Sequence, residues 1–245
     1  AIFGWQGAVE AGATGRQGEA GSRGEAGPRG DTGPQGATGA SAAGFSDLTD
    51  ERATVVYVEA GSSLGSGVIV SETEIITAEH VIRGHDSATI SVPGVGLVFA
   101  TLVGWDRTRD VALLRFSSGG FTPRIARLPA GEVLSGGVTI YRDETPGLFD
   151  SVMALGFVPT ISKTTPIATF GGIGVAWNIV PGDVGQYQFD AAITNGMSGG
   201  ALFDANGTLA GMILSAGSFE GNNRALSWRE ILEALPELRA GVENP

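Results

Sequence analysis

"TNGMSGGALFD", residues 194–204, places a single serine, Ser198, between glycines on both sides, and such a stretch holds either a nucleophile on a tight turn or a small residue in a flexible loop. Gly196, Ser198 and Gly200 match the G-x-S-x-G pattern of the nucleophile elbow in α/β-hydrolases. That fold requires the catalytic histidine to follow the serine, whereas both histidines of this chain, His80 and His85, precede it. The order of the residues therefore excludes an α/β-hydrolase and leaves the order histidine, aspartate, serine.

The chain after Ser41 has the pattern of an all-β protein. Short apolar runs rich in Val, Ile and Thr recur between glycine-rich turns without intervening helical periods, which is typical of an antiparallel barrel or sandwich. The exception is "SWREILEALPEL", residues 227–238, where Ser227 and Glu230 form the sequence pattern of a helix capping box. The expected strands are residues 54–58, 66–71, 74–78, 87–92, 97–104, 111–116, 152–157, 172–180, 187–193 and 207–214.

Candidate partners for Ser198 lie near the ends of these expected strands. His80 follows the apolar run "EIITA" and is either a general base or a histidine satisfied within the core. His85, in the polar segment "RGHDS", is expected to be a solvated loop residue. Asp110 directly precedes the run "VALLRF", so we expect its carboxylate to be partly shielded from water, as an imidazole partner or as an ordinary start of a strand. Asp106 lies in a more polar turn and is expected to be exposed.

Three segments resemble the signature blocks of the trypsin-like serine proteases, and the HtrA (Deg) branch of that family most closely. They are "SLGSGVIVSETEIITAEHVI" (63–82), "ATLVGWDRTRDVALLRF" (100–116) and "FDAAITNGMSGGALFDANGTLAGMILSAG" (189–217). The resemblance covers most of residues 54–230 and implies two six-stranded antiparallel β-barrels with the active site between them. It implies Ser198 as the nucleophile, His80 as the general base and Asp110 as the carboxylate that orients the base.

The same resemblance assigns the groups that bind a polypeptide substrate. The tetrahedral intermediate of peptide hydrolysis carries an oxyanion, and we expect the backbone N–H groups of Gly196 and Ser198 to stabilise it. Ala192 is implied at the base of the specificity pocket, which favours small or medium aliphatic side chains and gives no support to a preference for Lys or Arg. Neither a cofactor nor a metal is expected. The implied substrate-binding residues are Ala192, Thr194, Asn195, Ser215, Ala216 and Gly217.

Two residues depart from the usual pattern of the family. Glu79 precedes His80 where the family has a small residue, which brings a second carboxylate near the base. Met197 precedes Ser198 where the family has Asn or Asp. These departures support an alternative hypothesis, in which the barrels are the catalytically idle head of a structural or adhesive protein.

Composition excludes several other classes of protein. The formal net charge of −11 opposes binding to nucleic acid or to anionic lipid, and no apolar run approaches the length needed to cross a membrane. The absence of cysteine excludes disulfides and thiolate nucleophiles, and two histidines are too few for a histidine-rich metal site. Because the chain does not begin with Met, we expect a processed or truncated form of a secreted, cell-surface or periplasmic protein.

The N-terminal region has a different repeat. From Gly12 to Ser41 every third residue is Gly, and this period resembles bacterial collagen, in which only Gly fits at the axis of three wound chains. We therefore predict a stalk at residues 12–41 that makes the protein a homotrimer, after an interrupted extension at residues 1–11 and before a protease domain at residues 42–245. A flexible glycine-rich linker, acting as a monomeric spacer, is the alternative.

Overall fold

The computed structural model describes residues 48–129, 131–133, 139–141, 146–177, 184–217 and 222–245. The extension at residues 1–11 and the collagen-like segment at residues 12–41 lie outside these residues, so both remain predictions. In the described parts, no helix is long and apolar enough to cross a membrane.

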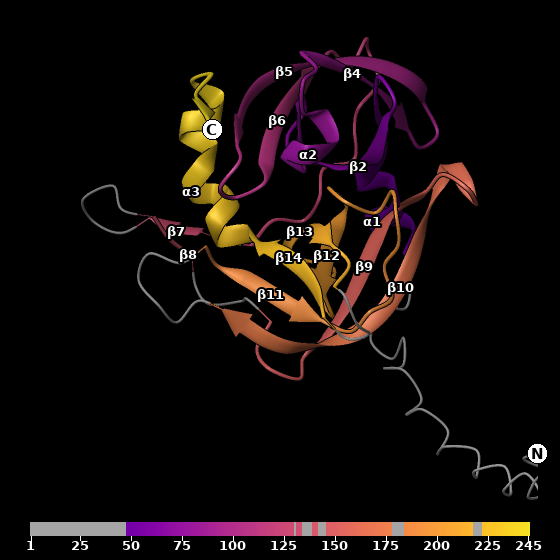
Figure 1. Ribbon diagram of the computed structural model, residues 1–245. Coiled ribbons are helices and arrows are strands. Elements are labelled where there is room, and N and C mark those ends of the chain that lie inside the picture. Colours follow the sequence, from indigo (N-terminus) through magenta and orange to yellow (C-terminus); the bar gives the residue numbers. More distant parts are fainter. Residues whose placement is uncertain (1–47, 130, 134–138, 142–145, 178–183, 218–221) are drawn as a thin grey trace, which may run out of the picture. The chain divides into compact units, whose positions relative to one another are not determined.

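The first half of the described chain forms a closed barrel of six antiparallel strands (Figure 1). The strands follow one another around the barrel in the order β5, β4, β1, β2, β3 and β6, and pairing between β5 and β6 closes it. Two short helices accompany the barrel, α1 before its first strand and α2 after β3. The bounds are α1 Thr49–Thr54, β1 Val55–Ala60, β2 Ser63–Ile69, β3 Glu74–Thr77, α2 Glu79–Ile82, β4 Ser87–Val92, β5 Gly96–Asp106 and β6 Val111–Phe116.

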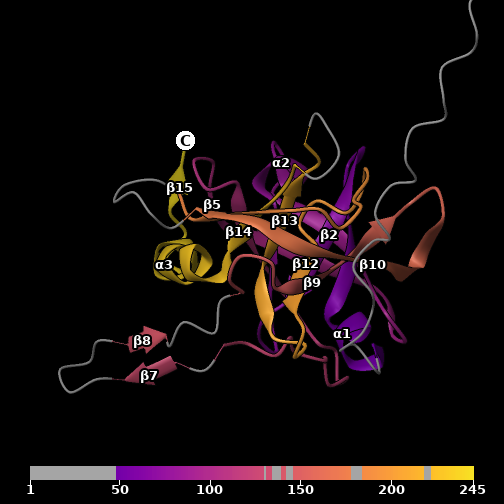
Figure 2. The ribbon, with the colours of Figure 1, turned by 90° about the horizontal axis from the view of Figure 1, so that it is seen from below.

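The second half forms another closed six-stranded barrel, in the order β10, β11, β14, β13, β12 and β9. A two-stranded hairpin of β7 and β8 precedes it in the chain and belongs to neither barrel (Figure 2). The bounds are β7 Gly131–Val133, β8 Thr139–Tyr141, β9 Ser151–Val158, β10 Ser162–Trp177, β11 Gln186–Phe189, β12 Ala201–Asp204, β13 Leu209–Ser215 and β14 Asn223–Ser227. The expected all-β fold with two six-stranded antiparallel barrels is confirmed.

Strand β9 explains how the two barrels pack together. Its residues Val152 and Ala154 are fully buried in the core of the second barrel, whereas Met153 and Leu155 belong to a core that continues into the first barrel. A strand that is buried on both faces must be apolar at successive positions, and "VMALGF" meets this requirement. The barrels are therefore joined by apolar packing as well as by the chain.

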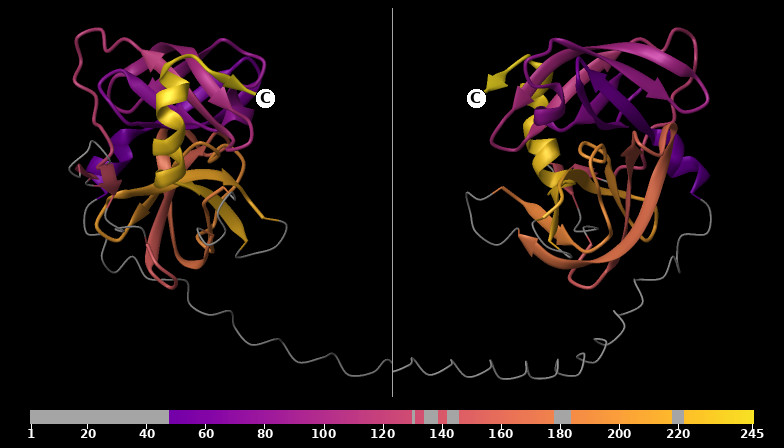
Figure 3. Two further views of the ribbon diagram at one scale, coloured as in Figure 1. Left: turned by 90° about the vertical axis from the view of Figure 1, so that its left-hand side faces the viewer. Right: turned by 45° about the vertical axis from the view of Figure 1, so that its right-hand side comes forward.

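The C-terminal helix α3, Trp228–Arg239, links the second barrel to the first (Figure 3). The Ser227 hydroxyl accepts a hydrogen bond from the Glu230 N–H at 3.4 Å, which confirms the expected N-cap. The buried face of α3 includes Trp228 and Ile231, and the helix packs mainly on β5, β6 and β13. The chain then adds strand β15, Glu243–Asn244, in parallel to β5.

Candidate active site

Two hydrogen bonds join His80 to the carboxylate of Asp110, one from the imidazole and one from the backbone. His80 lies in α2, and its Nδ1 is 2.7 Å from Asp110 Oδ2, while its backbone N–H donates to Asp110 Oδ1 at 3.0 Å. Asp110 has a φ of 53°, a left-handed conformation that aspartate tolerates better than most residues. Because an ionised carboxylate only accepts hydrogen bonds, the pair places the imidazole proton on Nδ1 and leaves Nε2 as an acceptor.

Ser198 lies in a tight turn that requires glycine on either side. Gly196 has a φ of 98° and Gly199 a φ of 82°, both in the left-handed region. A Cβ atom at Gly199 would be only 2.1 Å from the carbonyl oxygen of Ser66, and one at Gly196 would be 2.4 Å from Cδ of Pro159. The shape of the turn therefore requires glycine at positions 196 and 199, and a flexible loop does not account for them.

Some backbone N–H groups of the turn donate hydrogen bonds to nearby carbonyl groups and others do not. Met197 donates its N–H to the Thr194 carbonyl at 3.1 Å, and Gly199 donates to the Ile213 carbonyl at 2.7 Å. By contrast, the N–H groups of Gly196 and Ser198 have no acceptor among the described residues. These are the two groups that the sequence predicts as oxyanion donors.

Residues of the first barrel bring the turn close to His80. The position that a Cβ of Gly65 would take is 3.1 Å from the Ser198 carbonyl oxygen and 2.6 Å from Cγ2 of Val81, the residue after His80. In the part of the chain that the structure describes, no hydrogen bond joins His80 to Ser198. Such bonds are often long without substrate and shorten in the reacting complex.

Ser66, a residue that sequence reasoning missed, connects the turn to the first barrel. It is fully buried, and its hydroxyl donates to the Gly196 carbonyl at 2.7 Å and accepts from the Phe157 N–H at 2.8 Å. Its backbone N–H donates to the Ser198 carbonyl at 2.8 Å. The only sequence signal is a lone hydroxyl between two glycines at the start of an apolar strand.

The residues expected to bind substrate lie on two segments of the second barrel. Ala192, Thr194 and Asn195 are exposed in the segment that leads to Ser198. Ser215 ends β13 and is followed by the exposed Ala216 and by Gly217. Both segments run close to the turn, since Gly199 and Ile213 are hydrogen-bonded to one another.

Comparisons with known proteins agree with this architecture. The family described as "Trypsin-like peptidase domain" matches residues 65–212. The chain belongs to the trypsin-like peptidases. The serine endoprotease DegS of Escherichia coli (strain K12) is 32% identical over 178 residues, which cover 71% of this chain and 45% of that protein. The expected HtrA (Deg)-like serine protease domain is confirmed.

Two further relatives extend the comparison. A "Probable periplasmic serine endoprotease DegP-like" protein of Marinomonas sp. (strain MWYL1) is 28% identical over 184 residues, covering 73% of this chain and 36% of that protein. The crystal structure of the serine endoprotease from Yersinia pestis superposes with a TM-score of 0.67 at 25% identity, over 83% of this chain and 68% of the other. This trypsin-like peptidase spans less than half the length of the curated relatives named here.

One expectation about a residue near the site is wrong, and another is confirmed only in part. Asp106 is buried, with 3% of its surface exposed, because it accepts hydrogen bonds at 2.9 Å from both the backbone and the guanidinium of Arg109. Burial raises the pKa of Asp106, but these hydrogen bonds outweigh burial and hold the pKa below its usual value. His85 lies in a loop, as expected, but it is half-buried because its ring lies against the backbone of Gly61.

The two departures from the family pattern both have structural explanations in this peptidase. The Glu79 side chain is only 3% exposed and forms ion pairs with Arg83 and, at 3.3 Å, with Arg107, so its charge is compensated beside His80. Met197 is 1% exposed and packs in the core of the second barrel against Gly156. An apolar residue before Ser198 therefore anchors the turn in the core of the second barrel.

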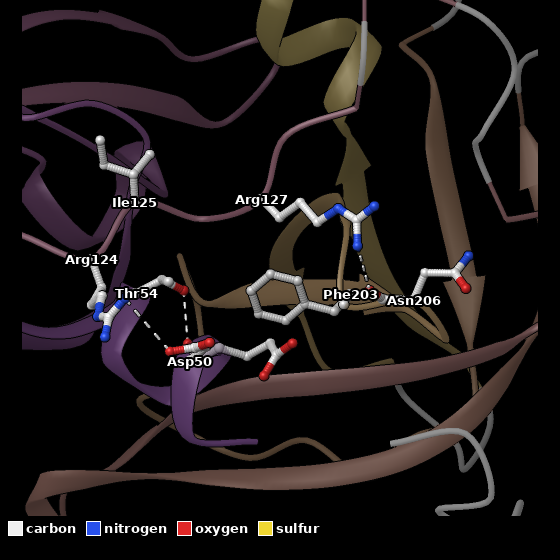
Figure 4. A pocket seen from close by; sticks show the side chains of 9 residues that line it. Asp50, Thr54, Arg124, Ile125, Arg127, Phe203 and Asn206 are labelled. Carbon is white, nitrogen blue, oxygen red and sulfur yellow. Dashed lines mark hydrogen bonds and ion pairs between the residues drawn. The ribbon is translucent and has the colours of Figure 1, made fainter. Parts of the chain in front are cut away.

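Another concave region lies away from these residues. A polar pocket of about 300 Å³ is bounded by α1, residues 124–127 and the turn between β12 and β13 (Figure 4). There Arg127 donates to the Asn206 carbonyl at 3.3 Å, and Arg124 is 3.8 Å from Asp50. Ser198 precedes β12, whereas this pocket lies at the far end of that strand, so it is no part of the candidate active site. Within the described ranges, no group of three or more His, Cys, Asp and Glu side chains could hold a metal ion.

Proposed function

We propose that this peptidase is a serine endopeptidase in which Ser198 is the nucleophile, His80 the general base and Asp110 the group that orients His80. The observation that carries the proposal is the 2.7 Å contact between His80 Nδ1 and Asp110 Oδ2, in a barrel whose Ser66 is hydrogen-bonded to the Ser198 turn. Fully buried apolar residues on both sides of the interface support a fixed relation between the two halves of the site.

The proposed reaction forms and then hydrolyses an acyl-enzyme. Ser198 Oγ attacks the carbonyl carbon of the scissile peptide bond while His80 Nε2 takes its proton, and the oxyanion that forms accepts hydrogen bonds from the N–H groups of Gly196 and Ser198. His80 then gives this proton to the leaving amine as the C–N bond breaks. Water attacks the ester, His80 takes the proton of the water, and the proton returns to Ser198 as the acid product leaves. Asp110 stabilises the imidazolium in both halves of the reaction.

We further infer that residues 12–41 form a collagen-like stalk that assembles the protease domain, residues 42–245, into a homotrimer. The unbroken glycine period supports this assembly, because a triple helix requires glycine at every third position and a single flexible chain does not. A location outside the cytoplasm is proposed from the DegP-like relative, which is named as periplasmic.

Labelling with a fluorophosphonate probe tests the activity. The folded wild-type chain is expected to react at Ser198, and Ser198→Ala is expected to lose labelling and to lower turnover about 10⁶-fold while remaining folded. A folded wild-type chain that never reacts would instead support the catalytically idle head. Native mass measurement on the intact chain tests the assembly, and a single-chain mass would support the monomeric spacer.

A further inference from the structure

Glu79 is a buried carboxylate that the proposed reaction does not use. It is almost fully buried and is the first residue of α2, directly before His80. The helix lies beside β6 in the first barrel (Figure 1). A buried carboxylate loses its hydration, so it requires charged or hydrogen-bonding partners. The partners of Glu79 therefore determine what its burial achieves.

Arg83 fixes the carboxylate of Glu79 from the same short segment of the chain. Its Nε donates to Oε1 at 3.0 Å and to Oε2 at 2.9 Å, and its Nη2 also donates to Oε2. A guanidinium that reaches both oxygens of a carboxylate sets its orientation as well as compensating its charge. The hydrogen bonds and the charge of Glu79 raise the pKa of Arg83, and the charge of Asp110 adds to this increase. Arg83 is therefore attracted to both carboxylates, although it is hydrogen-bonded to Glu79.

Arg107 connects the same carboxylate to a different element. Its Nη2 and its Nε donate to Glu79 Oε1 at 3.3 Å and 3.4 Å. Arg107 lies in the turn between β5 and β6, and its carbonyl accepts a hydrogen bond from the Asp110 N–H at 3.3 Å. Its guanidinium is 4.9 Å from the centre of the Trp105 ring, so the side chain is supported by β5. Glu79 therefore ties the helix that carries His80 to the turn that carries Asp110.

The two elements that Glu79 joins are weak on their own. Helix α2 has four residues and no side-chain cap among the described residues, and a single helical turn is unstable alone. Asp110 has a φ of 53°, which a residue other than glycine adopts at some cost. Burial of Val81 and Ile82 holds the apolar side of the helix, while Glu79 supplies the attachment on its polar side. A small shift of either element would lengthen the 2.7 Å contact between His80 Nδ1 and Asp110 Oδ2.

We propose that Glu79 is a positioning residue, which holds His80 in line with Asp110 through Arg107 and keeps the guanidinium of Arg83 away from Asp110. This inference rests on the proposed peptidase function and adds a residue that acts through its neighbours. Loss of the Glu79 charge leaves two guanidinium groups uncompensated, and an arginine that pairs with Asp110 would draw this carboxylate away from the imidazole. The cost is expected in kcat, because the general base is then misplaced in the reacting complex.

The first test compares kcat and KM of the full chain with those of Glu79→Gln, which keeps the shape of the side chain and removes its charge. This variant is expected to lower kcat about 10- to 100-fold with little change in KM. Glu74→Gln is the matched control, because Glu74 is also buried and bonded to an arginine, Arg239, but lies at the end of β3 farther from α2. It is expected to keep the wild-type kcat.

The second test examines the link from its other end. Arg107→Met keeps an unbranched side chain next to Trp105 and removes the charge that binds Glu79. It is expected to lower kcat, and the double variant Glu79→Gln/Arg107→Met is expected to be slower than the wild type by less than the product of the two single effects. Independent effects, which multiply in the double variant, would contradict a shared link.

Two further measurements report the geometry of the pair. The proton between His80 Nδ1 and Asp110 is expected to give a strongly downfield 1H NMR line, identified by its change in Asp110→Asn. This line should broaden or disappear in Glu79→Gln and persist in Glu74→Gln. A cavity of about 320 Å³ borders Glu79, so sodium formate is expected to raise the kcat of Glu79→Ala above its value in sodium chloride at the same ionic strength.

The outcomes separate this inference from the proposed function. If fluorophosphonate labels the wild type but Glu79→Gln keeps the wild-type kcat and the downfield line, the role of Glu79 is overturned and the peptidase function stands. Equal losses of kcat in Glu79→Gln and Glu74→Gln would also overturn it, and if Glu79→Gln does not fold, Arg107→Met decides, since Arg107 is exposed. A folded wild type that is never labelled would overturn the peptidase function, and the downfield line would still decide whether Glu79 holds His80 against Asp110.

Discussion

Replacing Ser66 with alanine removes a hydroxyl of the first barrel that is hydrogen-bonded to two backbone groups of the second half of the chain. The Gly196 carbonyl would lose its donor at 2.7 Å and the Phe157 N–H its acceptor at 2.8 Å, and both lie in a fully buried region. An unsatisfied buried polar group costs about 1–3 kcal/mol, so two of them set a range of about 2–6 kcal/mol. Because neighbouring effects are not additive, we expect Ser66→Ala to lower the free energy of unfolding by about 3 kcal/mol.

The same substitution is expected to slow the chemical step. The Gly196 carbonyl belongs to the peptide unit between the two proposed oxyanion donors, so its release loosens both N–H groups. Misplacement by a fraction of an ångström is expected to lower kcat about 10- to 100-fold with little change in KM. Urea denaturation and steady-state kinetics measure the two effects, with Ser63→Ala on the same strand as the control. A Ser66→Ala variant with wild-type stability and wild-type kcat would refute this reasoning.

Three other substitutions test separate parts of the fold and site. The hydrogen bonds from Arg239, the shortest at 2.7 Å, hold the pKa of Glu74 below its usual value. Glu74→Gln is therefore expected to lower the free energy of unfolding at pH 7 by about 1–2 kcal/mol, measured by urea denaturation. A carboxyl with a lowered pKa stabilises the fold only while it is ionised, so the stability difference between wild type and Glu74→Gln should vanish as the pH falls below about 4. A stability difference that does not depend on pH would contradict the argument. Glu233→Gln, in an exposed ion pair at 3.4 Å, is the control. Met197→Ala removes a side chain that is 1% exposed and is expected to lower stability by about 2–4 kcal/mol in thermal denaturation, whereas a loss below 1 kcal/mol would show that Met197 is no anchor. Gly196→Ala is expected to abolish fluorophosphonate labelling, because its Cβ would be 2.4 Å from Pro159, whereas Gly84→Ala, which has a φ of 79° and nothing within 4 Å, should label normally; equal labelling of both variants would be inconsistent with a tight turn.

Most strands could be predicted from the sequence because their apolar runs are long and bounded by turns. The strands that were missed are those whose pattern is weak, such as β12, Ala201–Asp204, which has four residues directly after the Ser198 turn. The first half of β10 also escaped prediction, since "SKTTPIATFG", residues 162–171, mixes polar and apolar residues on a strand that is mostly half-exposed. Only pairing with β9 makes this segment a strand.

The candidate site likewise contains residues that could be predicted from the sequence and residues that could not. His80, Asp110 and Ser198 could be singled out because each belongs to a recognisable segment. Asp106 could not be placed correctly, since its burial depends on Arg109, which is in turn 3.1 Å from Glu230 of the distant helix α3. Ser66 has no local signal either, because its hydroxyl binds backbone atoms that only the folded barrels bring within reach.

The residue before Ser198 and the carbonyl group of Ser198 itself are held by different barrels. Met197 is embedded in the core of the second barrel, while the Ser198 carbonyl is bonded to Ser66 of the first barrel. A small separation of the barrels would therefore displace Ser198, the proposed nucleophile, before either barrel lost its strands. During gradual heating or chaotrope addition, enzymatic competence should disappear ahead of the circular-dichroism signal, which would make inactivation an early reporter of separation at the seam between the halves.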